Sequence, residues 1–278
     1  MKYQLIVDSC CELTDDLKES LNAISIPLKM IIGDEEFVDN ENLDIDRFLK
    51  LIGNVKELPK SSCPSPGDYA DAYLKSDADY IFTVTLSSRL SGSYNSAIKG
   101  KEIAEEEGKK IHVFDSKSAS ACELLIALKI KELIDSGLEP DDIIAKVDEF
   151  IAQSQIFFVL EKNDNLIKNG RMSSFKGKAL SMLNIKLILG SDGDGNIKLF
   201  STARGYTNAI NKLAETIADS CAGKKGQTLV ITHCQNLTAV KFLVKAVKST
   251  CSFRQIVVMP TGGLSSMYAD IGGVLAAF

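Results

Sequence analysis

The sequence predicts an α/β fold with two α/β domains, a Rossmann-like parallel sheet in the N-terminal one and a mixed sheet in the C-terminal one. The chain has 278 residues, which is long for one hydrophobic core and sufficient for two. Short apolar runs alternate with helical patterns in the first half, as in parallel βαβ units. From about residue 156 a hairpin pattern interrupts this alternation, so we expect a domain boundary near residue 155.

The N-terminal domain, residues 1–155, is expected to contain three buried strands, each followed by a helix. The strands are expected at 3–8, 80–86 and 111–114, and the helices at about 14–21, 93–107, 119–136 and 140–151. Gly108 and Gly137 are typical of helix ends. Ligands of parallel sheets bind beyond the carboxyl ends of the strands. The loops after Val7, Leu86 and Phe114 therefore mark the edge where a site is expected.

The C-terminal domain, residues 156–278, is expected to include an antiparallel element. Strands are expected at 157–160, 228–232 and 255–259, and helices at about 207–218 and 237–248. The segments 185–189 and 197–200 flank the turn-forming residues 190–196 (GSDGDGN), a pattern typical of a β-hairpin. These residues resemble the start of a calcium loop, but an EF-hand needs Gly and Glu where Ile197 and Ala203 stand. The hairpin is the favoured interpretation.

Composition excludes several classes of protein. Hydrophobic residues make up 45% and charged residues 25%, and the net charge of −5 argues against a nucleic-acid surface. No apolar run approaches a membrane span or a signal peptide, so we expect a soluble cytoplasmic protein. The 7 cysteines are scattered and form no CxxC pair, which is typical of free thiols in a reducing compartment.

Motifs for catalysis and cofactor binding are missing from the sequence. Only 2 histidines occur, so a His-dependent triad or metal site has few places to form. Gly262-Gly263 and Gly272-Gly273 lack the context of GxGxxG, and neither a P-loop nor GxSxG is present. We expect no metal, no cofactor and no catalytic residue.

Two Ser-rich loops are the best candidates for a binding site. Residues 61–67 (SSCPSPG) and 87–93 (SSRLSGS) each precede an expected helix. Unpaired N–H groups at the start of the second helix and the hydroxyls of Ser91 and Ser93 can donate to an anion, which Gly92 allows to approach closely. The alternative is that both loops are only helix caps and turns. On spacing alone this alternative is favoured.

Three isolated polar residues have default structural interpretations. Arg171 and Arg204 are each expected to be solvated surface arginines that can lend positive charge to a site. His233 ends an expected strand, where a hydrogen-bonded structural histidine is favoured over a catalytic one.

Several segments, in order, resemble the DegV family of bacterial fatty-acid-binding proteins. The matching segments are Asp8-Ser9 with Leu13-Thr14, residues 61–67, residues 86–97 (LSSRLSGSYNSA), Val113 to Ser116, Gly170 to Ser173, and Gly193 to Gly195 with Arg204. The likeness spans nearly the whole chain, and Leu90-Ser91-Gly92 is its most specific part.

The resemblance implies a long-chain fatty acid, such as palmitate or stearate, bound in an apolar tunnel between the two domains. Its carboxylate would be held by Ser61, where the family usually has Thr, and by Ser91. Further contacts to the head group or to a partner are expected from Ser62, Gly92, Ser93, Arg171, Arg204 and Tyr268. The resemblance also implies a non-enzymatic carrier that presents the fatty acid to a fatty acid kinase.

The sequence departs from the family pattern near its C-terminus. Many members have a His-x-Gly-Pro-Gly segment whose histidine joins the head-group network, and here Tyr268 stands at about that place. A tyrosine hydroxyl can hydrogen-bond a carboxylate but carries no charge near neutral pH. Family members that serve a fatty acid kinase present the carboxylate for phosphorylation and release the acyl phosphate, and this departure weakens that implied role more than it weakens lipid binding. Two alternatives remain: a phosphoryl-transfer enzyme subunit that binds a phosphorylated small molecule in the same loops, and a lipid-gated regulator.

Overall fold

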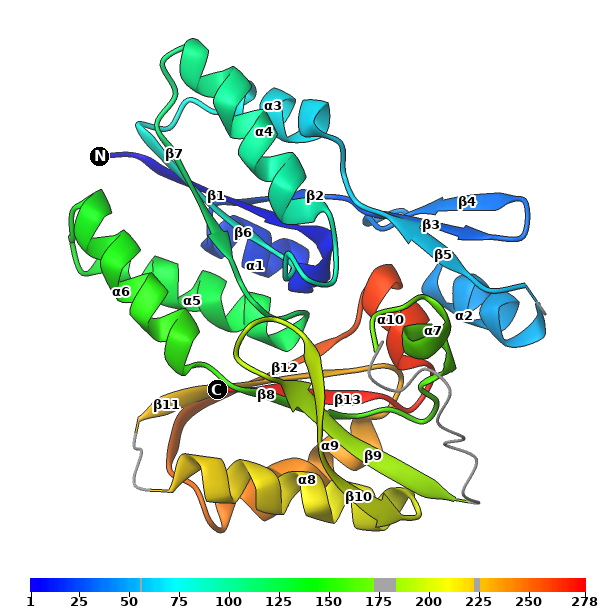
Figure 1. Cartoon of the computed structure of the whole chain (residues 1–278). Coiled ribbons are helices and arrows are strands. Elements are labelled where there is room, and N and C mark those ends of the chain that lie inside the picture. The colour runs from blue at the N-terminus through cyan, green and yellow to red at the C-terminus, as the bar shows by residue number, and fades with distance from the viewer. Residues whose placement is uncertain (56, 173–183, 223–225) are drawn as a thin grey trace.

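The computed structural model confirms the predicted α/β fold class. It describes residues 1–55, 57–172, 184–222 and 226–278. The strands of these residues form a four-stranded, a six-stranded and a three-stranded sheet (Figure 1).

The four-stranded sheet is parallel and has the order β2-β1-β6-β7. Its strands are β1 (Tyr3–Asp8), β2 (Ala23–Ile26), β6 (Tyr80–Thr85) and β7 (Ile111–Asp115). The accompanying helices are α1 (Asp15–Ser20), α3 (Pro66–Lys75), α4 (Ser93–Glu106), α5 (Ala121–Asp135) and α6 (Pro140–Gln153). β1 and β6 are buried along almost their whole length, because helices cover both faces of a parallel sheet. Their apolar runs were therefore readable from the sequence.

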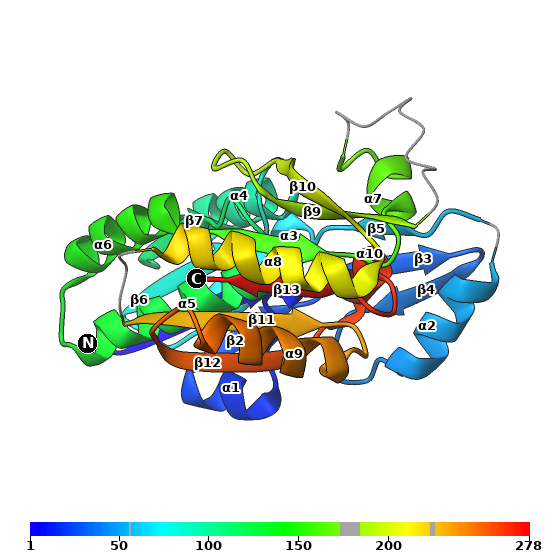
Figure 2. The same cartoon turned by 90° about the horizontal axis from the view of Figure 1, so that it is seen from below.

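The six-stranded sheet is mixed and has the order β10-β9-β8-β13-β11-β12. Its strands are β8 (Ile156–Val159), β9 (Ile185–Ser191), β10 (Ile197–Arg204), β11 (Gln227–His233), β12 (Phe253–Pro260) and β13 (Val274–Ala277). Within this sheet, β11–β12 is the one parallel pair among the described strands, and the other pairs are antiparallel. Helices α8 (Tyr206–Cys221) and α9 (Leu237–Lys248) cover its outer face (Figure 2). The predicted hairpin is confirmed as β9–β10, and Gly193 and Gly195 adopt positive φ in its turn.

The sequence interpretation missed the small antiparallel sheet, whose order is β4-β3-β5. It consists of β3 (Lys29–Ile32), β4 (Glu35–Val38) and β5 (Lys60–Ser62), and helix α2 (Ile45–Asn54) lies beside it. The interpretation also missed β2 and β13 of the larger sheets, and η1 (Ser9–Cys11), α7 (Asp164–Lys168) and α10 (Gly263–Ala269). Apart from α2, these elements have three to seven residues, too few for a hydrophobic period to stand out.

Helix α5 lies between the two larger sheets (Figure 1). One apolar cluster joins Phe82 of β6, Leu124 and Ile126 of α5, and Phe158 and Leu275 of the six-stranded sheet. The large sheets therefore share a core. The boundary predicted near residue 155 falls between α6 and β8, and it stays a prediction because the shared core gives no independent test of it.

Close packing of α3 against α4 fixes the start of α4, where the second Ser-rich loop ends. Gly100 of α4 is buried in this contact. A Cβ atom at this position would lie 2.7 Å from the Tyr69 Cβ and 2.8 Å from the Pro66 carbonyl oxygen. The two helices can approach this closely only because residue 100 has no side chain.

We therefore expect Gly100→Ala to lower the free energy of unfolding by about 1–3 kcal/mol, the usual cost of overpacking a core. Gly53→Ala in α2 is the matched control, because no described atom lies within 4 Å of the place that its Cβ would take. Helix propensity should leave that variant as stable as the parent or slightly more so. Urea unfolding measures both, and equal stability of the two variants would contradict this packing argument.

Candidate functional site

A cavity of about 300 Å³ lies between the parallel sheet and the six-stranded sheet. Residues that follow β1, β6 and β7 line one side of it, as expected for the carboxyl edge of a parallel sheet. Residues of β8, β9, β10 and β13 line the opposite side.

Most of the cavity wall is apolar. The aliphatic and aromatic side chains that line it are Leu28, Leu86, Leu90, Ala119, Ile156, Phe158, Leu160, Leu166, Ile197, Leu264, Ala269 and Leu275. They come from strands of the six-stranded sheet, from the loops that follow β2, β6, β7 and β8, and from the short helices α7 and α10. Such a wall favours an apolar ligand or an apolar part of one.

Hydroxyl groups gather at one part of the wall. The Ser61 Oγ on β5 lies 3.1 Å from the Tyr268 Oη on α10, so these hydroxyls are hydrogen-bonded across 207 positions of the chain. Ser62, Ser91 and Gly92 line the same cavity. The two Ser-rich loops therefore meet, as the sequence predicted from their position and family likeness.

Gly92 allows this meeting for a reason that the sequence did not reveal. A Cβ atom on Gly92 would lie 2.9 Å from the Cys63 Sγ of the other loop. The glycine thus makes room for the first Ser-rich loop, and its φ of −76° needs no special freedom.

Arg171 lies beside the hydroxyl groups. Its Nε donates to the Leu90 carbonyl oxygen at 3.2 Å, and one terminal nitrogen donates to the Asn169 carbonyl oxygen at 2.8 Å. Its guanidinium carbon lies 5.9 Å from the centre of the Tyr268 ring, within the range of a cation–π contact. Arg171 is half-buried at the cavity rather than being a fully solvated surface residue.

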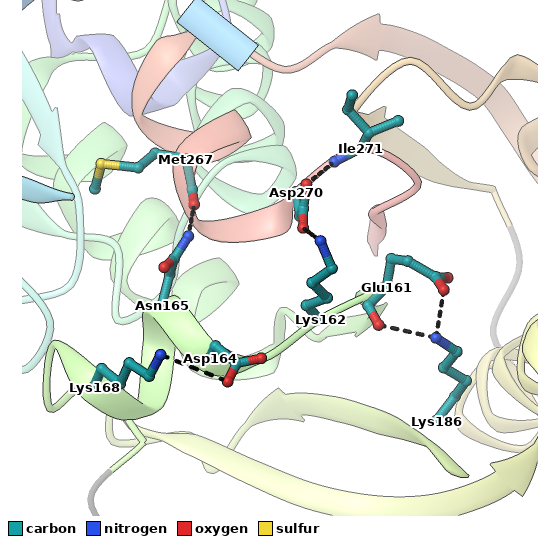
Figure 3. A network of polar contacts seen from close by, with 9 residues as sticks. All are labelled: Glu161, Lys162, Asp164, Asn165, Lys168, Lys186, Met267, Asp270 and Ile271. Atoms are coloured by element: carbon teal, nitrogen blue, oxygen red, sulfur yellow. Dashed lines mark hydrogen bonds and ion pairs between the residues drawn. The ribbon is translucent and has the colours of Figure 1, made fainter. Parts of the chain in front are cut away.

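A polar network holds α7, which precedes Arg171, against α10, which carries Tyr268 (Figure 3). The Asn165 side-chain amide donates to the Met267 carbonyl oxygen at 2.7 Å. Lys162 pairs with Asp270 at 3.0 Å, and Lys186 of β9 binds the Glu161 carboxylate at 2.6 Å. The exposed ion pairs add little energy singly, but together they cross-link the elements behind the cavity.

Two buried acids hold the start of α10. The Asp39 carboxylate accepts from the Gly263 and Leu264 N–H groups at 2.6 and 3.0 Å, which places a negative charge at a helix N-terminus. Glu12 accepts from the Gly262 N–H and from the Ser120 hydroxyl. A Cβ on Gly262 would lie within 3.2 Å of both carboxylates. The Gly262-Gly263 pair therefore serves close packing onto these acids.

Burial sets the ionisation of the two acids. Removal from water raises the pKa of Glu12 to about 8, although hydrogen bonds from Ser265, Gly262 and Ser120 oppose this shift. Burial also raises the pKa of Asp39, opposed by the Leu264, Ser9 and Gly263 donors. Glu12 therefore holds a proton over part of the neutral range.

Two predicted residues lie away from the cavity wall. The Ser93 hydroxyl is buried and lies 3.1 Å from the Tyr69 Oη, so it supports the second loop from behind. Arg204 is exposed at the end of β10. The roles assigned to Ser61, Ser62, Ser91, Gly92, Ser93, Arg171, Arg204 and Tyr268 stay predictions.

Other residues of the cavity were not anticipated. Ser118, Ser120 and Lys117 line it from the β7–α5 loop, and Cys10 and Ser265 line it from η1 and α10. Lys117, Ser118 and Ser120 follow the strand that was expected at 111–114. Because ligands bind beyond the carboxyl ends of parallel strands, the sequence could have indicated them as it indicated the loop after Leu86. His233 does not belong to this wall, and its Nδ1 accepts from the Asn236 N–H at 3.2 Å, as predicted for a structural histidine.

The fold and the cavity define a class of α/β proteins with an apolar pocket between a parallel and a mixed sheet. The DegV family model, described as "Uncharacterised protein, DegV family", matches residues 2–277. The chain belongs to the DegV family, which confirms the resemblance seen in the sequence.

Three similar proteins are informative. A DegV domain-containing protein of Streptococcus gordonii is 35% identical and covers 100% of this chain and 99% of its own. A DegV family protein of Ruminococcus gnavus, refined with vaccenic acid, has a TM-score of 0.94, 37% identity and coverage of 99% of both chains. The Streptococcus pneumoniae fatty acid kinase (Fak) B3 protein, loaded with linoleic acid, has a TM-score of 0.90, 33% identity and coverage of 100% and 99%.

Two kinds of feature do not occur among the described residues. No group of His, Cys, Asp or Glu in them is arranged to hold a metal ion. None of their helices is long and apolar enough to cross a membrane.

The raised pKa of Glu12 predicts a pH-dependent stability. In the unfolded chain Glu12 loses its proton above its ordinary pKa of 4.5, whereas in the folded protein it keeps this proton up to a pH of about 8. The resulting stabilisation is complete below about pH 4.5 and is lost as the pH rises toward 8, with a slope of up to about 1.4 kcal/mol per pH unit. Glu12→Gln should reduce this slope, since the amide does not titrate.

Unfolding free energies measured by urea titration between pH 5 and 8 test this expectation, with about half-unit pH steps sufficient to define the slope. Glu19→Gln on the exposed side of α1 is the control and should keep the parental slope. Identical slopes for all three proteins would show that Glu12 is not a titrating group of the fold.

Proposed function

We propose that this protein binds one long-chain fatty acid in the cavity, with the carboxylate at Ser61 and Ser91 and the tail along the apolar wall. The observation that carries the proposal is the meeting of two Ser-rich loops at a cavity whose wall is mainly apolar. Fatty acids occupy the Ruminococcus gnavus and Streptococcus pneumoniae relatives of the same fold.

The energetics favour a ligand with a long tail and a single acidic group. Each buried methylene contributes about 0.8 kcal/mol, so the tail supplies most of the affinity. Each hydrogen bond from a hydroxyl or N–H group to the carboxylate adds about 1.5–3 kcal/mol. Arg171 is held by backbone carbonyl oxygens, which keeps a positive charge near the carboxylate without a direct ion pair.

The bound acid is available for presentation to a kinase partner. Ser62, Gly92 and Lys117 line the cavity and are exposed to solvent, so a partner can approach the head group there. The Streptococcus pneumoniae relative carries the name of a fatty acid kinase component. In this role the chain is a non-enzymatic carrier of the cytoplasm, and the exposed Arg204 is a candidate contact for the partner.

Native mass spectrometry of the purified protein tests the ligand class directly. A co-purified mass that matches palmitate, stearate or a related acid, and that organic extraction removes, supports the proposal. A phosphorylated small molecule in its place would instead favour a phosphoryl-transfer subunit and contradict fatty-acid carriage. Protein that stays empty after incubation with excess fatty acid would also contradict it.

Removing the head-group hydroxyls should weaken fatty-acid binding. Ser61→Ala and Ser91→Ala each delete one hydrogen bond to the carboxylate, so we expect the dissociation constant to rise about 10- to 100-fold. Ser252→Ala removes an exposed hydroxyl that does not line the cavity and should leave it unchanged. Displacement of a fluorescent fatty acid gives the constants, and parental affinity in both loop variants would refute the head-group site.

A larger side chain in the cavity wall should reduce the space for the fatty-acid tail. Ile197 of β10 lines the cavity, whereas the next residue, Lys198, is exposed because side chains alternate along a strand. Ile197→Trp should raise the dissociation constant or shift the preference to shorter acids, at about 0.8 kcal/mol for each methylene displaced. Lys198→Trp adds the same bulk outside and should bind as the parent does. The same displacement assay, run with fatty acids of different chain length, gives the dissociation constants of the parent and both variants. If all three proteins show the same dependence on chain length, the tail does not lie beside Ile197.

A further inference from the structure

Asp8, at the end of β1, holds both ends of the loop that carries Ser91. We call residues 86–93 the head-group loop. The Asp8 carboxylate accepts from the Leu86 N–H at 2.9 Å at the start of this loop, and the Ser93 hydroxyl at its end also favours the ionised form of Asp8. The Asp8 carboxylate also accepts from the Cys10 N–H at 3.1 Å and so fixes the start of η1. One buried side chain thus connects β1 with two segments that line or support the cavity.

Asp8 is connected to Ser91 through contacts of Ser93. Ser93 is held by Asp8 and by the Tyr69 hydroxyl at 3.1 Å. The Ser93 N–H in turn donates to the Ser91 Oγ at 3.2 Å. The position of the Ser91 hydroxyl therefore depends on Asp8, although Asp8 does not line the cavity.

Glu123 is the counterpart of Asp8 in the first turn of α5. It is fully buried, and no donor hydrogen-bonds to either of its carboxyl oxygens among the described residues. After burial, the groups that act most strongly on the Glu123 carboxyl are the Asp8 carboxyl and the Cys10 thiol. Two ionised carboxylates in contact, without a donor between them, would repel each other strongly in this apolar setting.

Among the described residues, the groups that act most strongly on this pair carry no positive charge. The titratable groups that face Asp8 and Glu123 are acids, thiols and a phenol from η1 and its C-cap, the segment after β4, and α3: Cys10, Cys11, Glu12, Asp39 and Tyr69. Burial, and next the Asp8 charge, raise the pKa of Glu123 well above its usual range. Burial also raises the pKa of Asp8, but the Leu86, Ser93, Glu123 and Cys10 donors oppose that shift.

We propose that Asp8 is the positioning residue of the head-group loop, and that Glu123 carries a proton which it donates to the Asp8 carboxylate. The neutral Glu123 allows Asp8 to remain ionised and to hold Leu86, Cys10 and Ser93 together. A neutral Glu123 also leaves one negative charge fewer behind the place where the carboxylate of the fatty acid would bind. The link to ligand affinity rests on the proposed function, whereas the protonated pair does not.

The first test uses the protein without ligand. Infrared difference spectroscopy of the full chain at neutral pH should show a protonated-carboxyl C=O band. Glu12 contributes to this absorption as well, so Glu123→Gln should remove only the part that Glu123 supplies, and Asp142→Asn on the exposed side of α6 should leave the absorption whole. A band unchanged by Glu123→Gln would overturn the proposal. So would its absence from the parent protein.

The second test compares three variants in fatty-acid binding. Glu123→Gln keeps a donor for Asp8 and should stay within about threefold of the parental dissociation constant. Glu123→Met has similar length but no donor, and Asp8→Asn removes the carboxylate. Each of these two should raise the constant about tenfold or more. Equal losses for Gln and Met at position 123, or parental affinity for Asp8→Asn, would contradict the positioning role.

Hydrogen exchange separates this proposal from the proposed function. In the ligand-free protein, Asp8→Asn and Glu123→Met should speed exchange at the Leu86 and Ser93 amides, while Glu123→Gln should not. If the parent protein binds no fatty acid, the proposed function fails, but exchange and the infrared band still decide the pair. Should Asp8→Asn fail to fold, the two substitutions at Glu123 still decide the positioning role.

Discussion

Buried carboxylates that accept backbone N–H groups are the interaction on which the cavity depends. Asp8 holds Leu86 and Cys10, Glu12 holds Gly262, and Asp39 holds Gly263 and Leu264. Burying a charge is costly unless several donors compensate it, so a carboxylate such as that of Asp39 can stay ionised only while the donors of its loop remain in place. Glu12 accepts from Gly262 while it holds a proton over part of the neutral range. The three loops therefore cannot move independently, and the walls of the cavity are held in one arrangement.

The cavity also needs both large sheets. The turn of the β9–β10 hairpin crosses to the parallel sheet, where the Ser87 Oγ donates to the Gly195 carbonyl oxygen at 2.8 Å and the Ser191 Oγ donates to the Lys117 carbonyl oxygen at 3.1 Å. A Cβ on Gly195 would collide with the Ser87 side chain. The glycine thus brings the hairpin onto the head-group loop, while α5 joins the two sheets from within the shared core. The site belongs to the junction of the sheets and not to either one.

The sequence predicted the parts of the site that follow local rules. Long apolar runs marked β1 and β6, and Ser91-Gly92 could be placed between a strand and a helix because both neighbours were periodic. The contact between Ser61 and Tyr268 required β5 and α10, which are too short to show a period. Glu12, Asp39 and Glu123 look like ordinary surface acids in the sequence, since their burial results from loops packing against α5 and α10. Charge burial of this kind is a tertiary property.

The identity of residue 268 and the state of Glu123 bear on the same question, the charge around the bound carboxylate. Tyr268 stands at about the place where the resemblance implies a histidine in many family members, and its hydroxyl, which is hydrogen-bonded to Ser61, carries no charge near neutral pH. Arg171 remains as a positive group, 5.9 Å from that ring. In the proposed function, a proton on Glu123 behind the head-group loop favours the ligand, because each added negative charge in a low-dielectric site opposes binding of an anion. The proton proposed on Glu123 and the guanidinium of Arg171 would therefore act in the same direction, from opposite sides of the head-group loop.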